Sequence, residues 1–385
     1  MKTIETESKY IAGTYKRFPI EIVSGSGCIA KDSAGKEYID LASGIAVNTF
    51  GYADKEWSDA VMQQINTLQH TSNLYYTDPC CTLAEMLCTR TGMKKVFFSN
   101  SGAEANECAI KVARKYAENK GKNTAILTLV NSFHGRTITT LAATGQDTFH
   151  GDFLPLTNGF YHTPANDIEA LTEAFEKIDP CAIMFETVQG EGGVNPLTKE
   201  FVAAIAALCE KNDALMIVDE VQTGNGRTGK LYSFMHYGIT PDVISTAKGL
   251  GGGLPIGATM LGEKVENIFT YGSHGSTFGG NPVCCAGAVN IISRLDDKML
   301  SEVSEKAELI KATLEGSDGV ESITGLGLMI GIKTTKTAGE VVAKCIENGV
   351  LVITAKDKVR LLPPLNIPTE ELKKALSIIA EACKA

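Results

Sequence analysis

Residues 241–257 read PDVISTAKGLGGGLPIG, and this stretch says more about the chain than any other. A short apolar strand pattern ends at Lys248, and the residues that follow the lysine have almost no side-chain bulk. A lysine that forms an imine must be desolvated enough to lower its pKa from about 10.4. Glycines also let a flat ring approach the backbone closely. Lys248 is therefore a candidate for imine chemistry, although a surface lysine before a glycine-rich loop would leave the same pattern.

The middle of the chain alternates short apolar runs with helical patterns, which is typical of an α/β layered fold. Runs such as ALMIVDE at 214–220 are apolar on both faces, and this predicts a mostly parallel sheet. Ser99, Glu186 and Asp219 then fall at the carboxyl ends of their strands, where open α/β sheets usually bind ligands. The pattern predicts helices at 103–118 and 168–177 and strands at 96–99, 125–130, 182–186, 215–219, 243–246 and 258–261.

The two ends of the chain have a different pattern. Residues 1–50 contain Gly- and Asp-rich turns, which suggest a hairpin-like segment. Long amphipathic helices follow residue 290, with short strands expected at 328–332 and 350–353. We therefore predict a large α/β domain at 51–290 and a small α+β domain built from 1–50 and 291–385.

Composition excludes several classes of protein. The formal net charge of -9 argues against a general nucleic-acid binder. No apolar run is long enough to span a bilayer, and the first ten residues are too polar for a secretory signal, so a cytosolic protein is expected. The eleven cysteines contain no C-x-x-C pair and are expected to be reduced thiols in apolar settings. The six histidines show no metal-ligand spacing, so no metal is expected.

Two segments offer a place for a phosphate. FFSNSGAEANECAIK at 97–111 runs from a strand into a helix, so Ser101, Gly102 and Ala103 would present a hydroxyl and free backbone amides at the helix N-terminus. Thr277 in SHGSTFGGNP is a further candidate phosphate ligand. Either segment could equally be an ordinary cap or a polar turn.

Asp219 ends the expected strand at 215–219. A buried carboxylate there can pair with a protonated pyridine nitrogen and make a cofactor a stronger electron sink. Phe133, in NSFHGRT, offers a flat face on which such a ring could stack. Asp-Glu after an apolar strand also occurs in nucleotide triphosphatases, and GNGRTGKL at 224–231 is one residue short of a P-loop. Because Leu231 stands where that motif needs a hydroxyl, nucleotide binding is kept only as an alternative.

Two arginines are candidates for bidentate recognition of carboxylates, Arg136 and Arg360. Arg360 is an isolated cation in the apolar run KVRLLPPL, and an arginine in such a setting is usually paired. Glu191, in VQGEGG, is a plausible partner, so a purely structural salt bridge is the alternative to substrate binding.

Together, and in this order, these segments resemble the class III, ornithine-type aminotransferases of fold type I over essentially the whole chain. The blocks that carry the resemblance are YIDLASGIAVN, HTSNLYYTDP, FFSNSGAEANECAIK, NSFHGRT, FETVQGEGGV, IVDEVQTGNGRTG, PDVISTAKGLGGGLPIGA, GSTFGGNP and VRLLPPL. The resemblance implies a pyridoxal 5'-phosphate enzyme that forms a homodimer with its active site at the subunit interface.

The resemblance also implies a role for each matching residue. Lys248 would be the Schiff-base lysine, Asp219 the partner of the pyridine nitrogen, Gln222 a contact of the phenolic oxygen and Phe133 the stacking ring. Ser101, Gly102 and Ala103 would hold the phosphate, with Thr277 from the neighbouring subunit. Arg360 would grip the α-carboxylate and Arg136 the far carboxylate of glutamate or 2-oxoglutarate. Glu191 would be a switch that pairs with an arginine when the other substrate is bound.

Within the family, SNLYYTDP, GIAVN and the compact length favour the subgroup that acts on N-acetylornithine. Ornithine aminotransferases carry a tyrosine where this chain has Gly44, and a glycine would leave room for an acyl group. Tyr15 and Gly44 are therefore expected at the substrate site. Succinylornithine, succinyl-diaminopimelate, ornithine and 4-aminobutyrate stay open as donors, and racemases and aminomutases share the scaffold.

The chain departs from the family after VNTFG, where Tyr52-Ala53-Asp54 replaces the usual His and Pro.

Overall fold

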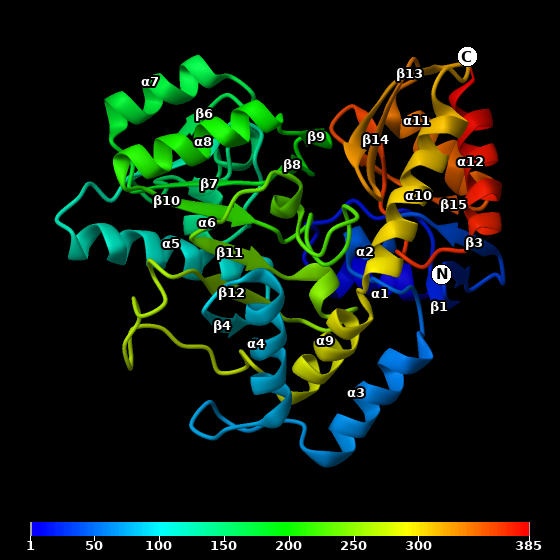
Figure 1. The fold of residues 1–385 in the computed structure, drawn as a ribbon. Coiled ribbons are helices and arrows are strands. Elements are labelled where there is room, and N and C mark those ends of the chain that lie inside the picture. The colour runs from blue at the N-terminus through cyan, green and yellow to red at the C-terminus, as the bar shows by residue number, and fades with distance from the viewer. Residues whose placement is uncertain (1, 385) are drawn as a thin grey trace.

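A seven-stranded sheet forms the centre of the larger part of the molecule (Figure 1). The computed structural model describes residues 2–384. In spatial order the strands are β4 (Lys95–Ser99), β12 (Gly257–Leu261), β11 (Val243–Thr246), β10 (Leu215–Asp219), β7 (Ala182–Phe185), β5 (Ile126–Leu129) and β6 (Phe160–Thr163). Only β12 runs against its neighbours, so the predicted mostly parallel sheet of an α/β fold is confirmed. The edge strand β6 was not predicted, because only its last residue is buried.

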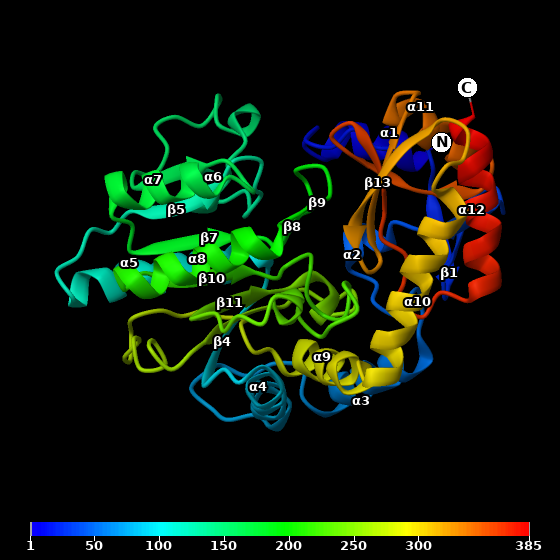
Figure 2. The ribbon, with the colours of Figure 1, turned by 45° about the horizontal axis from the view of Figure 1, so that its top comes forward.

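Helices cover both faces of this sheet, as the tilted view in Figure 2 shows. Successive side chains of a strand point to opposite faces. In β10, Leu215 and Ile217 pack with α5 (Gly102–Asn119), whereas Met216 and Val218 belong to the cluster that contains α7 (Ile168–Ile178) and α8 (Lys199–Asn212). This three-layer arrangement explains why the strands are apolar on both faces.

A second part of the molecule is built from both ends of the chain. One of its sheets contains β1 (Ile22–Ser26), β2 (Ile29–Asp32), β3 (Glu37–Asp40) and β15 (Val350–Leu351). The other contains β13 (Val320–Leu326), β14 (Met329–Thr334), β17 (Lys358–Leu361) and β16 (Ile353–Ala355). The helices that pack here are α10 (Asp297–Leu314), α11 (Ala338–Glu347) and α12 (Thr369–Cys383). The parallel pair β3–β15 joins the first forty residues to the C-terminal segment.

One strand prediction was wrong in this region. The single strand expected at 350–353 is two strands, and they belong to different sheets. Val352 between them is buried, so the apolar run continues although the backbone leaves one sheet for the other. Apolar periodicity reports burial, and here it could not report the change of hydrogen-bonding partner.

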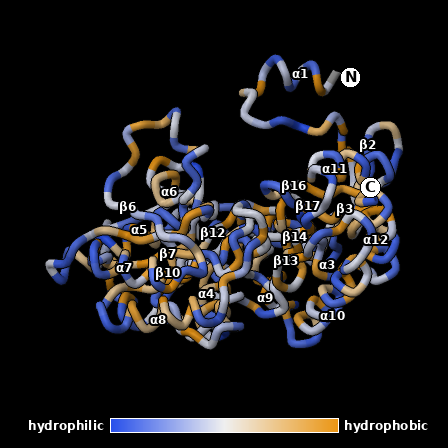
Figure 3. The backbone as a smooth tube through the Cα atoms, turned by 90° about the horizontal axis from the view of Figure 1, so that it is seen from above, coloured by the Kyte–Doolittle hydropathy of each residue, from blue (hydrophilic) through white to orange (hydrophobic). Residues whose placement is uncertain are grey.

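The remaining elements connect these parts or lie outside them. They are α1 (Lys2–Tyr10), α2 (Ser43–Ala46), α3 (Lys55–Thr67), α4 (Asp78–Thr91), α6 (Ile138–Ala143), β8 (Val188–Gln189), β9 (Asn195–Pro196) and α9 (Pro282–Arg294), with short 3-10 turns at Asp147–Phe149, Ser233–His236 and Lys248–Leu250. The N-terminal segment with α1 projects away from the rest of the molecule (Figure 3). Among residues 2–384, none of the helices is long and apolar enough to cross a bilayer.

Candidate active site

A cavity of about 460 Å³ opens at the carboxyl edge of the parallel strands. It lies where the end of β10 meets the segment after β11 and the N-terminus of α5. Eight of the residues predicted to be in the site line it: Ser101, Gly102, Ala103, Phe133, Arg136, Asp219, Gln222 and Lys248. Four separate segments of the chain thus meet at one site.

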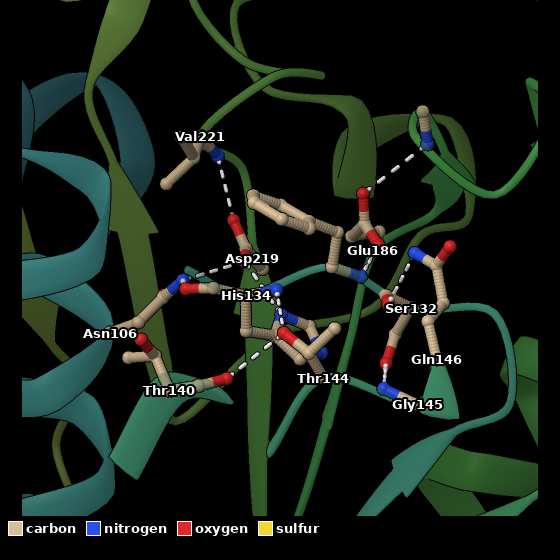
Figure 4. A network of polar contacts seen from close by, with 12 residues as sticks. Asn106, Ser132, His134, Thr140, Thr144, Gly145, Gln146, Glu186, Asp219 and Val221 are labelled. Atoms are coloured by element: carbon tan, nitrogen blue, oxygen red, sulfur yellow. Dashed lines mark hydrogen bonds and ion pairs between the residues drawn. The ribbon is translucent and has the colours of Figure 1, made fainter. Parts of the chain in front are cut away.

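Asp219 is buried at the end of β10 and is held from three directions (Figure 4). Asn106 Nδ2 donates to Asp219 Oδ2 at 2.8 Å, and His134 Nδ1 lies 2.7 Å from the same oxygen. The backbone N–H of Val221 donates to Oδ1 at 3.0 Å. These contacts fix the orientation of the carboxylate, and no cation of Lys or Arg neutralises it directly among the described residues.

A second buried carboxyl, Glu186, lies beside this network (Figure 4). The N–H groups of Phe133 and Gly190 donate to its two oxygens, at 2.9 Å and 3.3 Å. Burial raises the pKa of Glu186 above its ordinary value, and the nearby charge of Asp219 adds to this effect. Two buried carboxyls therefore lie close together, and their environments differ.

Lys248 follows β11 and begins a single 3-10 turn. Its φ angle of 45° is left-handed, a conformation that costs a non-glycine residue about 1–2 kcal/mol. Burial lowers the pKa of its amine, although the charges of Glu191 and Asp219 oppose this effect. Within the described part of the chain, the amine makes no hydrogen bond or ion pair. It is thus a desolvated amine available for reaction.

The N-terminus of α5 supplies backbone donors on another side of the cavity. Ser101 caps the helix, and its Oγ accepts the N–H of Glu104 at 3.2 Å. The first N–H groups of a helix have no acceptor within the helix, which makes this end a site for anions. A Cβ on Gly102 would lie only 2.6 Å from Cγ1 of Val221, so the close approach of these two segments requires glycine.

The buried Arg360 and the half-buried Glu191 form an ion pair next to the cavity. Arg360 Nη1 lies 2.6 Å from Glu191 Oε1 and donates to Gln222 Oε1 at 3.1 Å. Burial by itself raises the pKa of Glu191, but the charge and hydrogen bond of Arg360 outweigh it, so the pKa lies below its ordinary value. Nε of Arg360 is buried without a partner among the described residues. The guanidinium of Arg360 therefore keeps one N–H group that donates to none of the described residues.

Arg136 lies at the exposed side of the cavity. Its guanidinium lies 4.0 Å from the ring centroid of Phe149 and 5.6 Å from that of Phe133. The guanidinium is held by these aromatic faces. Its hydrogen-bonding groups can therefore receive an anion at the mouth of the site.

Five predicted residues do not line this cavity within their own chain. Two of them, Glu191 and Arg360, lie next to it and contact Gln222. The other three are Tyr15, Thr277 and Gly44. Tyr15 is 73% exposed and packs on Arg17, and Thr277 is exposed in the segment before α9. Gly44 has a φ of 62°, in a left-handed turn together with Ser43, Ile45 and Ala46. A Cβ there would meet Asn48 at an ordinary 3.7 Å. The left-handed backbone at this position favours glycine. The role of Gly44 in leaving room for an acyl group stays a prediction.

Comparison with known proteins places the chain in a family. A family model described as aminotransferase class-III matches residues 10–383. The chain belongs to the class III aminotransferase family. It is 48% identical over 381 residues to an acetylornithine aminotransferase of Haemophilus ducreyi, across 98% of this chain and 97% of that protein.

Solved aminotransferases share the fold. The N-acetylornithine aminotransferase of Stenotrophomonas maltophilia matches with a TM-score of 0.86 at 33% identity, covering 98% of each chain. An ornithine aminotransferase of Toxoplasma gondii with partial occupancy of PLP matches with a TM-score of 0.93 at 31% identity, covering 99% of this chain and 93% of that one.

Class III aminotransferases depend on pyridoxal 5'-phosphate, and the cavity fits this cofactor. It offers an available amine at Lys248, a buried carboxylate at Asp219, an aromatic face at Phe133 and backbone donors at the start of α5. A phosphate, a pyridine nitrogen and an aldehyde each have a residue of suitable chemistry in one cavity.

The P-loop alternative is wrong for this aminotransferase. Residues 224–231 form turns that are buried except at Lys230, and only a short 3-10 turn follows them. Arg227 donates to the carbonyl oxygens of Leu328 at 3.2 Å and Pro363 at 2.5 Å. The glycines at 226 and 229 have positive φ angles and allow close packing rather than a phosphate cradle. A P-loop needs a strand, a loop and a helix in succession, and here the helix is missing.

Three residues of the site in this class III enzyme were not singled out from the sequence as site residues: Asn106, His134 and Glu186. Asn106 is a buried polar residue on the otherwise apolar face of α5, which is the signal that could have found it. His134 directly follows Phe133. Glu186 had been placed at the carboxyl edge of the sheet, without a role.

Proposed function

We propose that this aminotransferase moves the δ-amino group of N2-acetyl-L-ornithine to 2-oxoglutarate, which gives N-acetyl-L-glutamate 5-semialdehyde and L-glutamate. This reaction belongs to arginine biosynthesis. The observation that carries the proposal is the Arg360–Glu191 pair, which contacts Gln222 at the wall of a cavity that a second arginine, Arg136, also lines. The names of relatives that are 40–48% identical over nearly the whole chain support the choice of substrate.

The two substrates carry different charges next to the reacting carbon. Glutamate has a carboxylate there and a second one further away, and Arg360 and Arg136 would bind these two groups. In N-acetylornithine the reacting carbon carries no carboxylate, and the only carboxylate lies at the far end, where Arg136 would bind it. Arg360 then needs another anion, and Glu191 at 2.6 Å supplies one. A movable Glu191 thus lets one site accept both substrates.

The remaining residues would hold the cofactor and move protons. Pyridoxal phosphate, when bound, supplies an electron-accepting ring. Lys248 would carry it covalently, Ser101, Gly102 and Ala103 would bind its phosphate, and Phe133 and Gln222 would contact its ring and phenolic oxygen. Asp219 would hold the proton of the ring nitrogen. Once displaced by the donor, the amine of Lys248 would take a proton from the substrate carbon as the general base.

We also infer a homodimer with shared sites in the cytoplasm. Asn73 donates to the carbonyl oxygens of Ser276 and Gly279 at 2.9 Å each, and Phe278 contacts His70. These contacts join two loops. The exposed large side chains on the two loops are Leu74, Tyr75, Tyr76, Tyr271 and Phe278. An exposed apolar surface of this kind favours a partner subunit. Thr277 lies on it, away from the cavity of its own chain, which fits a role in a neighbour's site. The free state of all eleven cysteines fits a reducing compartment.

The visible absorbance of the purified, cofactor-loaded protein tests the proposal. Addition of N-acetylornithine without a keto acid is expected to remove the absorbance band of the lysine-bound cofactor, and 2-oxoglutarate should restore it. Free ornithine, succinylornithine and 4-aminobutyrate serve as competing donors. A band that responds only to one of these would change the substrate. Absence of any band after addition of pyridoxal phosphate would contradict the proposal as a whole.

A further inference from the structure

Lys358 and Arg360 lie on the same face of β17, because they are two residues apart. This face points toward the β8–β9 hairpin, which carries Glu191 between its two strands. Arg360 contacts the hairpin through the Glu191 carboxylate. Lys358 contacts it at a different place, so the strand holds the hairpin at two points.

The contacts of Lys358 reach the hairpin directly and through one neighbour. Its Nζ donates to Asn195 Oδ1 at 2.9 Å and to Thr324 Oγ1 at 2.8 Å. Asn195 Nδ2 in turn donates to the carbonyl oxygen of Gly192 at 2.9 Å. Thr324 Oγ1 donates to the carbonyl oxygen of Val194 at 2.8 Å. The ammonium therefore fixes the backbone on the C-terminal side of Glu191.

Gly331 leaves the space that this arrangement needs. It lies opposite Arg360 in the β14–β17 pair and opposite Thr324 in the β13–β14 pair. A Cβ at this position would lie 2.8 Å from Cβ of Val194 and 3.1 Å from Cδ of Lys358. Because Gly331 has no side chain, the aliphatic stem of Lys358 can cross the sheet at this position, and the β8–β9 hairpin can pack against the sheet here.

The hairpin also adopts a conformation that needs support. Gly193 has a φ of 110° and Val194 a φ of 54°. A left-handed conformation is costly for a β-branched residue and persists only where the surroundings impose it. The bonds to Val194 and Asn195 are such surroundings.

We propose that Lys358 is a positioning residue for the Glu191–Arg360 pair and thereby sets the discrimination between the two substrates. This rests on the proposed function, in which Glu191 neutralises Arg360 for one substrate and leaves it for the other. Lys358 holds the hairpin so that only the Glu191 side chain moves. Without the ammonium, Asn195 and Thr324 lose a charge-assisted partner, and the backbone that carries Glu191 is no longer held.

The test compares Lys358→Met with Lys358→Arg and with Lys333→Met in the cofactor-loaded enzyme. Methionine keeps the length of the stem and removes the charge, whereas arginine keeps the charge. Lys333 lies opposite Lys358 on β14. Its ammonium pairs with Asp357 and, in the described structure, does not contact the hairpin. Lys333→Met therefore controls for the loss of a positive charge from this sheet. Two quantities are measured: hydrogen exchange of the peptide 188–196, and the ratio of kcat/KM for N-acetylornithine to that for glutamate.

In Lys358→Met, exchange in 188–196 should rise about tenfold, and the substrate ratio should change at least about fivefold. Lys358→Arg should restore most of both, and Lys333→Met should change neither. An unchanged ratio in Lys358→Met overturns the inference, whether or not exchange rises. A Glu191→Ala variant, measured in parallel, separates the two ideas. If Glu191→Ala changes the substrate ratio and Lys358→Met does not, Glu191 is the switch and the positioning role of Lys358 is wrong. If Glu191→Ala also leaves the ratio unchanged, the proposed switch itself is wrong.

Discussion

Nδ1 of His134 lies 2.7 Å from Oδ2 of Asp219, and both side chains are buried. Because Asp219 is the acceptor, Nδ1 carries the proton and the imidazole acts as a donor that orients the carboxylate. Nε2 of the same ring has no partner among the described residues. His134 therefore contacts Asp219 through a single N–H, and a variant can keep or remove that donor.

His134→Leu is expected to lower kcat about 10- to 100-fold, because a buried hydrogen bond to a charged group contributes about 1.5–3 kcal/mol. His134→Asn, whose Nδ2 lies close to the position of Nδ1, should keep most of the activity. Steady-state rates with saturating cofactor check this. Equal losses in both variants would mean that the ring matters only for packing.

Lys248→Met is expected to stabilise the cofactor-free protein at neutral pH. Burial lowers the pKa of Lys248 in the folded state below the ordinary 10.5, so the unfolded chain binds more protons between these two values. Stability of the parent protein therefore falls as the pH drops through this window. The advantage of the variant should grow as the pH falls from about 10.5, and thermal unfolding between pH 7 and 10 measures it.

Lys311→Met is the matched control, because Lys311 is only half-buried and pairs with Glu308 at 3.3 Å. It should show no such gain. If Lys248→Met destabilises the cofactor-free protein throughout this pH range, the amine is not held in a desolvated site.

Glu191→Ala is expected to favour glutamate over N-acetylornithine by at least about tenfold in kcat/KM. The variant leaves the buried Arg360 without an anion when the acyl-amine binds, whereas glutamate brings its own carboxylate. The KM for 2-oxoglutarate should fall, because the keto acid no longer competes with Glu191. Separate measurement of the two half-reactions by stopped-flow absorbance checks both effects. Unchanged relative rates would contradict the switch.

Gly102→Ala is expected to lower the free energy of unfolding by about 1–3 kcal/mol. Its new Cβ would lie 2.6 Å from Val221 Cγ1, and displacement of Val221 would also disturb the N–H that donates to Asp219. Urea unfolding measures the change. Gly339→Ala in α11 is the control, since a Cβ there meets nothing within 4 Å and alanine is the better helix former. A Gly102→Ala protein as stable as its parent would show that the two segments can separate without cost.

Much of the fold followed from local pattern. The strands β10 and β11 occupy the predicted residues, because continuous apolar runs buried on both faces are a strong signal. The edge strand β6 carries almost none of that signal, since three of its four residues are not buried. The change of sheet at Val352 left no trace in the sequence, because a buried residue looks the same whichever sheet its neighbours join.

The sequence by itself determined the chemistry available: a lysine before glycines, a carboxylate after an apolar strand, and two isolated arginines. These depend on residue type and on position within one element. Only the tertiary structure decided which of them meet. Glu191 and Arg360 are 169 residues apart and share one ion pair, and Asn106 and His134 become partners of Asp219 only because α5 and the segment after β5 pack against β10. Contacts between distant segments arise from packing and register, and a local pattern does not record them.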